Sequence, residues 1–188
     1  MTENIQPIIK TILRDIQVEL TDEFDRNFER QAFFSEKWQR RKSPARNEGR
    51  AILTDTGRLR RSIQSRVADA HIEFFSTEPY AAIHNEGGEI VVTDRMKRFF
   101  RAKAYEAAGS FGRKKDGSRR NDKRTVQLSD EAEFWKFMAL KKAGTTIKIP
   151  RRRFLGTSPE VEQAVRIIIE ENLSGYIEEA INFEIHEK

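Results

Sequence analysis

His84 is the histidine best placed for proton transfer or metal binding, because Asn85 and Glu86 follow it just before a glycine turn. Adjacent side chains on a helix do not converge on one ligand. The chain also lacks the His-x-x-x-His spacing of metal-binding helices and the G-x-S-x-G turn of serine hydrolases. His71 falls in an expected strand and His186 near the end of the chain. We therefore expect His84 to pack or to form a hydrogen bond beneath the turn.

Other patterns for catalysis or cofactor binding are weak. The chain has no cysteine, which excludes disulfides, thiol catalysis, Cys-ligated zinc and iron–sulfur clusters. Residues 109–115 resemble a phosphate-binding glycine loop only loosely, because they lack the G-x-x-x-x-G-K-[ST] spacing. The glutamate pairs at 170–171 and 178–179 point about 100° apart on a helix, which is typical of a solvated face. We expect no enzyme, no cofactor and no metal site.

Charge is strongly segregated along the 188 residues, although the formal net charge is only +5. Residues 1–36 carry four basic and eight acidic residues, and residues 160–188 carry two and eight. Residues 37–61 carry nine basic and two acidic residues, and residues 95–124 carry twelve and three. A basic middle can attract nucleic acid, whereas faces of opposite charge can also steer like subunits together. Composition alone leaves both alternatives open.

The densest basic run lies at residues 110–125. Its candidate contacts with DNA or with an acidic partner are Arg113, Lys114, Lys115, Arg119 and Arg120. Phe111 is the only aromatic residue in this run, so a base-stacking platform is not supported. No helix-turn-helix or zinc-finger pattern accompanies it. A solvated loop, DNA contact and contact with an acidic protein all remain open.

Hydrophobic periodicity predicts an α+β fold. Apolar residues recur at every third or fourth position from Ile9 to Phe28, which predicts an N-terminal helix. Period-two alternation and β-branched residues predict strands at 62–67, 71–76, 89–92 and 145–149. Further helices are expected at 79–86, 95–108 and 130–142.

The last helix is indicated by Ser158-Pro159-Glu160, which combines an N-cap, a first-position proline and an acid in the first turn. We expect its buried stripe to be Val161, Val165, Ile168, Ile169, Leu173, Tyr176, Ile177 and Ile181. The chain is then a single domain, 1–188, with a small antiparallel sheet of about four strands flanked by N-terminal and C-terminal helices. Residues 94–143 are a helical, basic insertion before the last strand, with a mobile loop at 110–125.

No membrane association is expected. The first four residues lack the basic cap that precedes the apolar segment of a signal peptide. The longest aliphatic run, residues 167–169, is far shorter than the roughly 20 residues of a bilayer span. We expect a soluble protein made in a cytoplasm.

Three blocks stand in order along the chain: residues 53–63 (LTDTGRLRRSI), 79–88 (PYAAIHNEGG) and 149–156 (IPRRRFLG). A Phe-Phe…Trp stretch ending at Trp38 precedes them. Together, over residues 33–165, they resemble the phage virion morphogenesis (tail completion) family, to which the G protein of phage Mu belongs. The excursion at 94–143 is longer than in the shortest members, so the resemblance assigns it no role.

Within these blocks most residues are expected to maintain the fold. The residues expected in the core are Leu59, Ile63, Phe154 and Leu155. Tyr80, Ala81 and Ile83 are expected to pack the short helix against the sheet. Gly87 and Gly88 are expected to allow a tight exit from the short helix that a Cβ would obstruct.

The resemblance implies a non-enzymatic structural protein of a tailed phage or prophage. Such a protein finishes or caps the tail, or joins it to the head, as a ring subunit. It implies assembly in the bacterial host cytoplasm, a final place in the virion tail or neck, and partners among tail and head–tail connector proteins.

The interaction surface is expected on basic residues opposite the acidic terminal helices. These residues are Arg40, Arg41, Lys42, Arg58, Arg60, Arg61, Arg151, Arg152 and Arg153. An acidic helix of one subunit meeting a basic rim of the next would be a heterologous contact, which closes into a ring. The alternative, from another class, is a DNA-binding accessory protein that uses residues 95–124.

Overall fold

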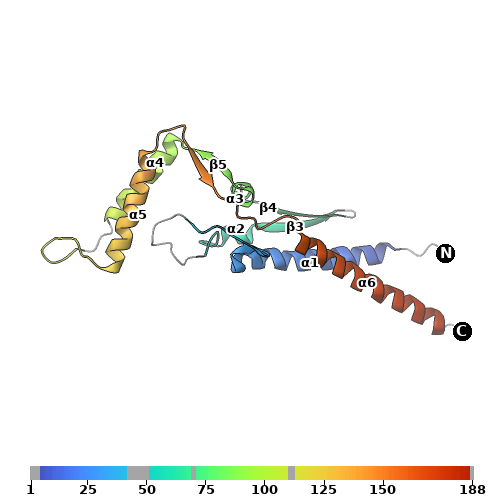
Figure 1. Ribbon diagram of the computed structural model, residues 1–188. Helices are drawn as coiled ribbons and strands as arrows, with labels where there is room; N and C mark the ends of the chain where they lie inside the picture. The colour runs from blue at the N-terminus through green and yellow to red at the C-terminus, as the bar shows by residue number, and fades with distance from the viewer. Residues whose placement is uncertain (1–4, 42–50, 69–70, 110–112, 187–188) are drawn as a thin grey trace. The chain divides into compact units, whose positions relative to one another are not determined.

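The N-terminal apolar stripe forms helix α1 (Gln6–Arg30), as its periodicity predicts. A proline lies in the first turn of this helix. The computed structural model describes residues 5–41, 51–68, 71–109 and 113–186, and for residues 179, 180 and 182–186 the backbone only. The chain divides into two units (Figure 1). Unit 1 comprises residues 1–38, 53–85 and 152–188, and unit 2 comprises residues 39–52 and 86–151.

Unit 1 is built on the two longest helices, α1 and α6 (Pro159–His186), together with short elements between them. These are β1 (Ala32–Phe33), β2 (Glu36–Lys37), α2 (Arg58–Arg61), β3 (Ile63–Ala68), β4 (His71–Ser76) and α3 (Ala81–Glu86). β1 pairs with β2, and β3 pairs antiparallel with β4 in a hairpin that lies against α1. The first half of α6 packs against the same helix.

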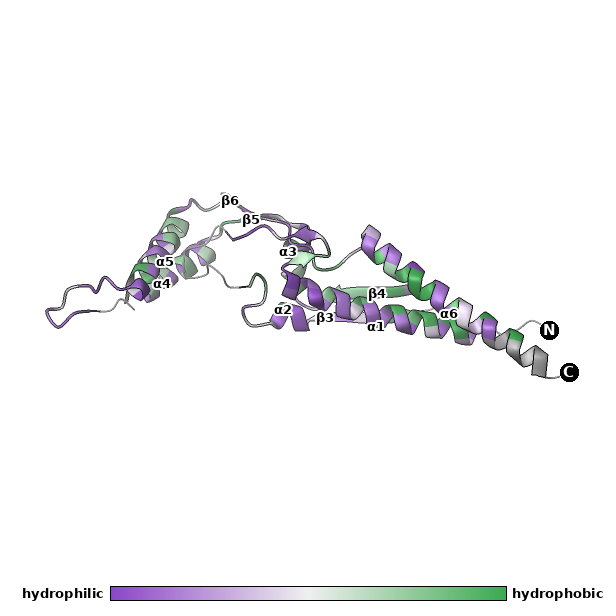
Figure 2. Ribbon diagram, turned by 60° about the horizontal axis from the view of Figure 1, so that its bottom comes forward, coloured by the Kyte–Doolittle hydropathy of each residue, from purple (hydrophilic) through white to green (hydrophobic). Residues whose placement is uncertain are grey.

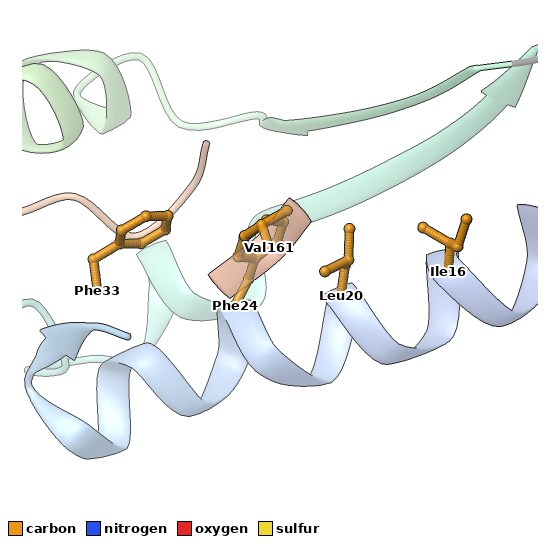
Figure 3. Close-up of a cluster of buried hydrophobic side chains, with 5 residues drawn as sticks. All are labelled: Ile16, Leu20, Phe24, Phe33 and Val161. Atoms are coloured by element: carbon orange, nitrogen blue, oxygen red, sulfur yellow. The ribbon is translucent and has the colours of Figure 1, made fainter. Parts of the chain in front are cut away.

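The core of unit 1 lies where α1, β1 and the start of α6 meet. Ile16, Leu20 and Phe24 point from successive turns of α1 toward Val161 of α6 and the hairpin, as Figure 3 shows. The Phe24 ring packs edge-on against Phe74, with ring centroids 5.0 Å apart. Burial of such aliphatic and aromatic side chains, worth about 1.5–3 kcal/mol each, is what holds these short elements together.

Unit 2 is a two-stranded sheet followed by a pair of helices. β5 (Gly88–Val91) pairs antiparallel with β6 (Thr146–Ile149). Between them α4 (Asp94–Gly109) and α5 (Lys123–Leu140) pack along each other. Trp135 stacks on Phe100 with centroids 5.8 Å apart and contacts Phe99 edge-on. These aromatic contacts join the two helices.

The mixed helix-and-strand class predicted from the sequence is confirmed. The four predicted strands are all present, but within the described residues they form separate two-stranded sheets rather than one sheet, with the short β1–β2 pair in addition. Helix α5 begins at Lys123, whereas periodicity placed its start at residue 130. Asp122 explains the difference, because its side chain accepts a hydrogen bond from the backbone N–H of Thr125 at 2.8 Å and caps the helix earlier.

The prediction that α6 buries its apolar stripe throughout is wrong. Val161 is buried, and Val165, Ile168 and Ile169 pack against the core. Beyond them Leu173, Ile177 and Ile181 are 41%, 55% and 54% exposed. Periodicity identifies the apolar face of a helix but not the surface that covers it. No helix in the described part of the chain has the length and apolar character needed to cross a membrane.

Candidate functional site

Three side chains from distant parts of unit 1 hold the segment that precedes α6. The Trp38 indole donates a hydrogen bond to the carbonyl of Arg153 at 2.6 Å. Asn27 donates to the carbonyl of Phe154 at 3.4 Å, and its own side-chain oxygen accepts from the backbone N–H of Phe34 at 2.9 Å. With Asn85, described next, Asn27 and Trp38 form what we call the clamp.

Asn85 makes the most extensive contact of the clamp. Its Oδ1 accepts hydrogen bonds from the backbone N–H groups of Phe154 and Leu155 at 2.9 and 3.0 Å. Its Nδ2 donates to the carbonyl of Leu155 at 3.1 Å. One residue earlier, the carbonyl of His84 accepts from the backbone N–H of Arg152 at 2.8 Å. The end of α3 therefore binds this irregular segment much as a neighbouring strand would.

Phe154 lies at the centre of the clamp and is fully buried. Its ring packs on Phe28 with centroids 5.3 Å apart, and Phe28 contacts Trp38 at 5.5 Å. The predicted burial of Phe154 is thus confirmed.

The glycine exit after α3 also behaves as predicted. Gly87 has φ +74°, and a Cβ built there would lie 2.8 Å from the backbone nitrogen of Arg151. A side chain at this position would therefore clash with backbone. Of the other residues named in these blocks, Leu59 and Ala81 are buried, and Ile63, Ile83 and Leu155 are half-buried. Tyr80 is 38% exposed and its ring is edge-on to that of His84.

Several arginines expected on the interaction surface are engaged within unit 1. Arg60 forms ion pairs with Asp25 and Glu29 of α1, the latter at 2.7 Å. Its hydrogen bond lowers the pKa of the Asp25 carboxyl. Arg58 pairs with Glu78 at 2.6 Å. These contacts tie the first sequence block to α1 and to the segment before α3.

Three more arginines of the expected interaction surface lie in unit 1, and each has different surroundings. Arg61 donates to the carbonyl of Thr56 at 2.9 Å. Arg152 is buried, and the guanidinium of Arg153 lies 4.5 Å from the centroid of the Phe33 ring. Such a cation–π contact stabilises by about 0.5–2 kcal/mol. These side chains contribute to the fold of unit 1 as well as to its charge.

The other members of the expected surface belong to unit 2. Arg40 and Arg151 are exposed, and Arg41 donates to the carbonyl of Ala51 at 3.1 Å. Lys42 lies outside the described residues. That this set forms an interaction surface stays a prediction.

His84 packs beneath the turn, as expected, with its ring edge-on to Tyr80. Its Nδ1 is buried and has no hydrogen-bond partner in the described structure. Burial, together with the positive charge of Arg152, lowers the pKa of His84. In the described part of the chain no three His, Asp or Glu residues are grouped so that they could hold a metal ion.

The basic run of unit 2 ends in an exposed turn. Arg113 and Arg119 pair as an isolated antiparallel bridge, and the N–H of Gly117 donates to the carbonyl of Lys114 at 3.0 Å. All five cations named from the sequence are exposed, namely Arg113, Lys114, Lys115, Arg119 and Arg120. Residues 110–112 lie outside the described residues. The turn presents its cations to solvent just before α5.

Sequence analysis missed a groove of about 530 Å³ between α4 and α5. Small residues line it, among them Ala104 and Ala108 of α4 and Ala132 of α5. The rim carries Tyr105 and Leu140, which are 78% and 73% exposed. The four-residue spacing of the α4 alanines was the available signal, because residues at that spacing share a helix face.

The sequence model of the phage virion morphogenesis family matches residues 4–174. No curated protein and no solved structure gives a significant match. The matched range contains the complete clamp and all three ordered sequence blocks. The chain belongs to the phage virion morphogenesis family.

Proposed function

We propose that this chain is a non-enzymatic structural subunit that completes the tail, or joins it to the head, as part of a ring. Membership of a virion morphogenesis family supports a structural role. The observation that carries the proposal is the clamp, where the second and third family-like blocks meet through Asn85 and Phe154. The residues behind the resemblance thus hold unit 1 together rather than form a catalytic site, which supports a structural role.

Charge distribution supports a heterologous contact between subunits. Residues 160–188, which cover α6 from its second residue onward, carry eight acidic and two basic residues. Residues 95–124 of unit 2 carry three acidic and twelve basic residues. Opposite charges on different surfaces of one chain favour head-to-tail association, which closes into a ring when the rotation per subunit permits.

The first test is the absolute mass in solution, by light scattering behind a sizing column, with nucleic acid removed and at low and high salt. A species larger than a dimer that dissociates at high salt is expected, because the contact is electrostatic. Negative-stain images of that species should show closed rings. A monomer at every salt and concentration would overturn self-assembly through charged surfaces.

The location in the particle needs a separate measurement. Gold-labelled antibody against this chain should decorate the tail end or neck of virions of the phage that encodes it. Label on the capsid surface, or none on intact and disrupted virions, would overturn the proposed location.

A second candidate function is DNA binding through the exposed turn of unit 2. It is favoured by one observation, that five cations lie exposed within residues 113–120. Replacing Lys114, Lys115 and Arg120 with Gln leaves the Asp122 cap of α5 intact. If the turn binds phosphates, its affinity for labelled duplex DNA should weaken, and the slope of its salt dependence should fall by about one unit for each cation that had neutralised a phosphate. Unchanged binding would exclude this role for the turn.

A further inference from the structure

We propose that the C-terminal part of α6 of one copy docks in the α4–α5 groove of a second copy. This inference rests on the proposed self-assembly and specifies the two surfaces that make it. The docking helix is residues 170–186, and the receiving surface is the groove lined by Ala104, Ala108 and Ala132.

The docking helix has an apolar face that its own unit leaves exposed. Asn172 still contacts α1, donating to Asp15 at 3.1 Å. Beyond it Leu173, Ile177 and Ile181 recur every fourth residue, so they lie along one face. Each is more than 40% exposed. Figure 2 shows green, apolar segments between purple, polar ones along the coloured part of α6. A helix face of this kind commonly inserts into an apolar groove of a partner.

The groove has the shape to receive such a face. Alanines along it leave space between the helices for large side chains of a third helix. Tyr105 and Leu140, both more than 70% exposed, also line the groove. Tyrosine is among the side chains that contribute most to interfaces, and Leu140 adds exposed apolar surface beside it.

Electrostatics identifies the occupant as a second copy of this chain. Residues 170–186 contain five glutamates and no lysine or arginine. The groove is lined by Arg101, Arg119 and Lys136. A single acidic side chain, Glu133, lies among them. An acidic helix with an apolar stripe therefore matches a basic groove with an apolar floor, and both are encoded in one sequence.

The lengths agree as well. α4 has 16 residues and α5 has 18, and at about 1.5 Å per residue the docking helix spans about 25 Å, close to either of them. The contact joins different surfaces of the two copies, so the copy that donates its helix still has a free groove and the copy that receives it still has a free helix. Repetition of this contact generates a ring or an open chain.

The absence of cysteine makes the contact testable by single introduced thiols. Ser129→Cys places a thiol in the groove, and Ser174→Cys places one beside the apolar stripe; both changes are nearly isosteric. The two full-length variants are mixed, one with a larger tag, and treated with a short bis-maleimide. Gln64→Cys, on the exposed side of β3, replaces Ser174→Cys in the control mixture.

A mixed cross-linked species well above the control is expected, and it should disappear at high salt. If the thiol variants form oligomers of the same mass as the parent but cross-link no more than the control mixture, the docking is overturned and ring assembly is not. No oligomer at all would overturn both. A chain carrying both thiols that cross-links only at monomer mass would show that α6 folds back on its own groove, which also overturns the proposal.

Charge reversal provides a second readout that does not depend on thiol geometry. Changing Glu171 and Glu178 to Lys, or Arg101 and Lys136 to Glu, should each abolish the oligomer when the variant is alone. Mixing the two doubly reversed chains should restore a mixed species, because the altered helix again meets a groove of opposite charge. Circular dichroism shows whether each variant is folded, and folded variants that associate like the parent would contradict the proposal.

Discussion

The side-chain oxygen of Asn85 accepts the backbone N–H of Phe154 at 2.9 Å, although the two residues are 69 positions apart in the sequence. The same oxygen binds the next N–H, and the amide nitrogen binds the carbonyl of Leu155. Residues 150–158 have no helix or strand. A side chain therefore supplies the hydrogen bonds that regular structure would supply elsewhere.

Replacing Asn85 with Ala should lower the free energy of unfolding of unit 1 by about 2–3 kcal/mol, because two N–H groups beside a buried Phe lose their acceptor. Urea unfolding can follow Trp38 fluorescence in a Trp135→Phe background, since the chain has only two tryptophans. Asn121→Ala, on an exposed loop residue, is the control and should change stability by less than about 0.5 kcal/mol. Equal effects of the two changes would show that the clamp does not stabilise unit 1.

Gly87→Ala should destabilise unit 2 by about 2–4 kcal/mol, because a left-handed φ and a clash with the Arg151 backbone act together. Gly144 is the matched control in the same unit, with φ +87° and no atom near its would-be Cβ. Gly144→Ala should lower the stability of unit 2 by only about 1 kcal/mol, the cost of a left-handed backbone conformation for alanine. Urea unfolding followed by Trp135 fluorescence, in a Trp38→Phe background shared by both variants, reports both changes. A destabilisation no larger at Gly87 than at Gly144 would mean that the chain there relaxes away from Arg151.

Sequence periodicity predicted the elements whose patterns are local. α1 and the strand at 71–76 were placed correctly because their apolar residues repeat with the period of a helix or a strand. The early start of α5 was missed because the segment after Asp122 carries mainly Lys, Arg and other polar residues. A capping side chain, rather than an apolar stripe, sets that boundary.

The clamp could not be predicted, because its contacts join residues far apart in the sequence. Asn85 was noted only as a neighbour of His84, and Asn27 falls among charged residues of α1 with no local signal that it is fully buried. Likewise, no local pattern indicates that Phe137 of α5 is 62% exposed and lies beneath Lys141. Local patterns show which residues are apolar, whereas only the fold determines which of them are covered.

His84 should make unit 1 less stable in mild acid. Its pKa is lowered in the folded state, so the unfolded chain takes up a proton first as the pH falls below about 6.5, the ordinary value for histidine. Stability is therefore full above that pH and decreases as the pH falls toward the lowered pKa of the folded state. His84→Gln should flatten this dependence in urea titrations between pH 7 and pH 5. His71→Gln, on the exposed side of β4, retains His84 and should retain the decrease. A His84→Gln profile parallel to that of the parent would contradict the assignment.

Arg60 should stabilise unit 1 more than an ordinary surface arginine, because it binds two carboxylates of α1 at once, those of Asp25 and Glu29. Arg60→Gln should lower the free energy of unfolding by about 1 kcal/mol, the upper end for partly exposed ion pairs. Arg66, which pairs with Glu73 on the exposed face of the β3–β4 hairpin, is the matched control and should contribute less than about 0.5 kcal/mol.

Arg60 lowers the pKa of Asp25, so the stabilisation by Arg60 is present above the ordinary aspartate pKa of 3.8 and is lost as the pH falls through the lower pKa of the folded state. Urea unfolding of both variants at neutral pH, and again in acid where the chain remains folded, measures the difference. An Arg60→Gln effect no larger than that of Arg66→Gln, or one that persists in acid, would show that the two ion pairs do not hold the first sequence block to α1.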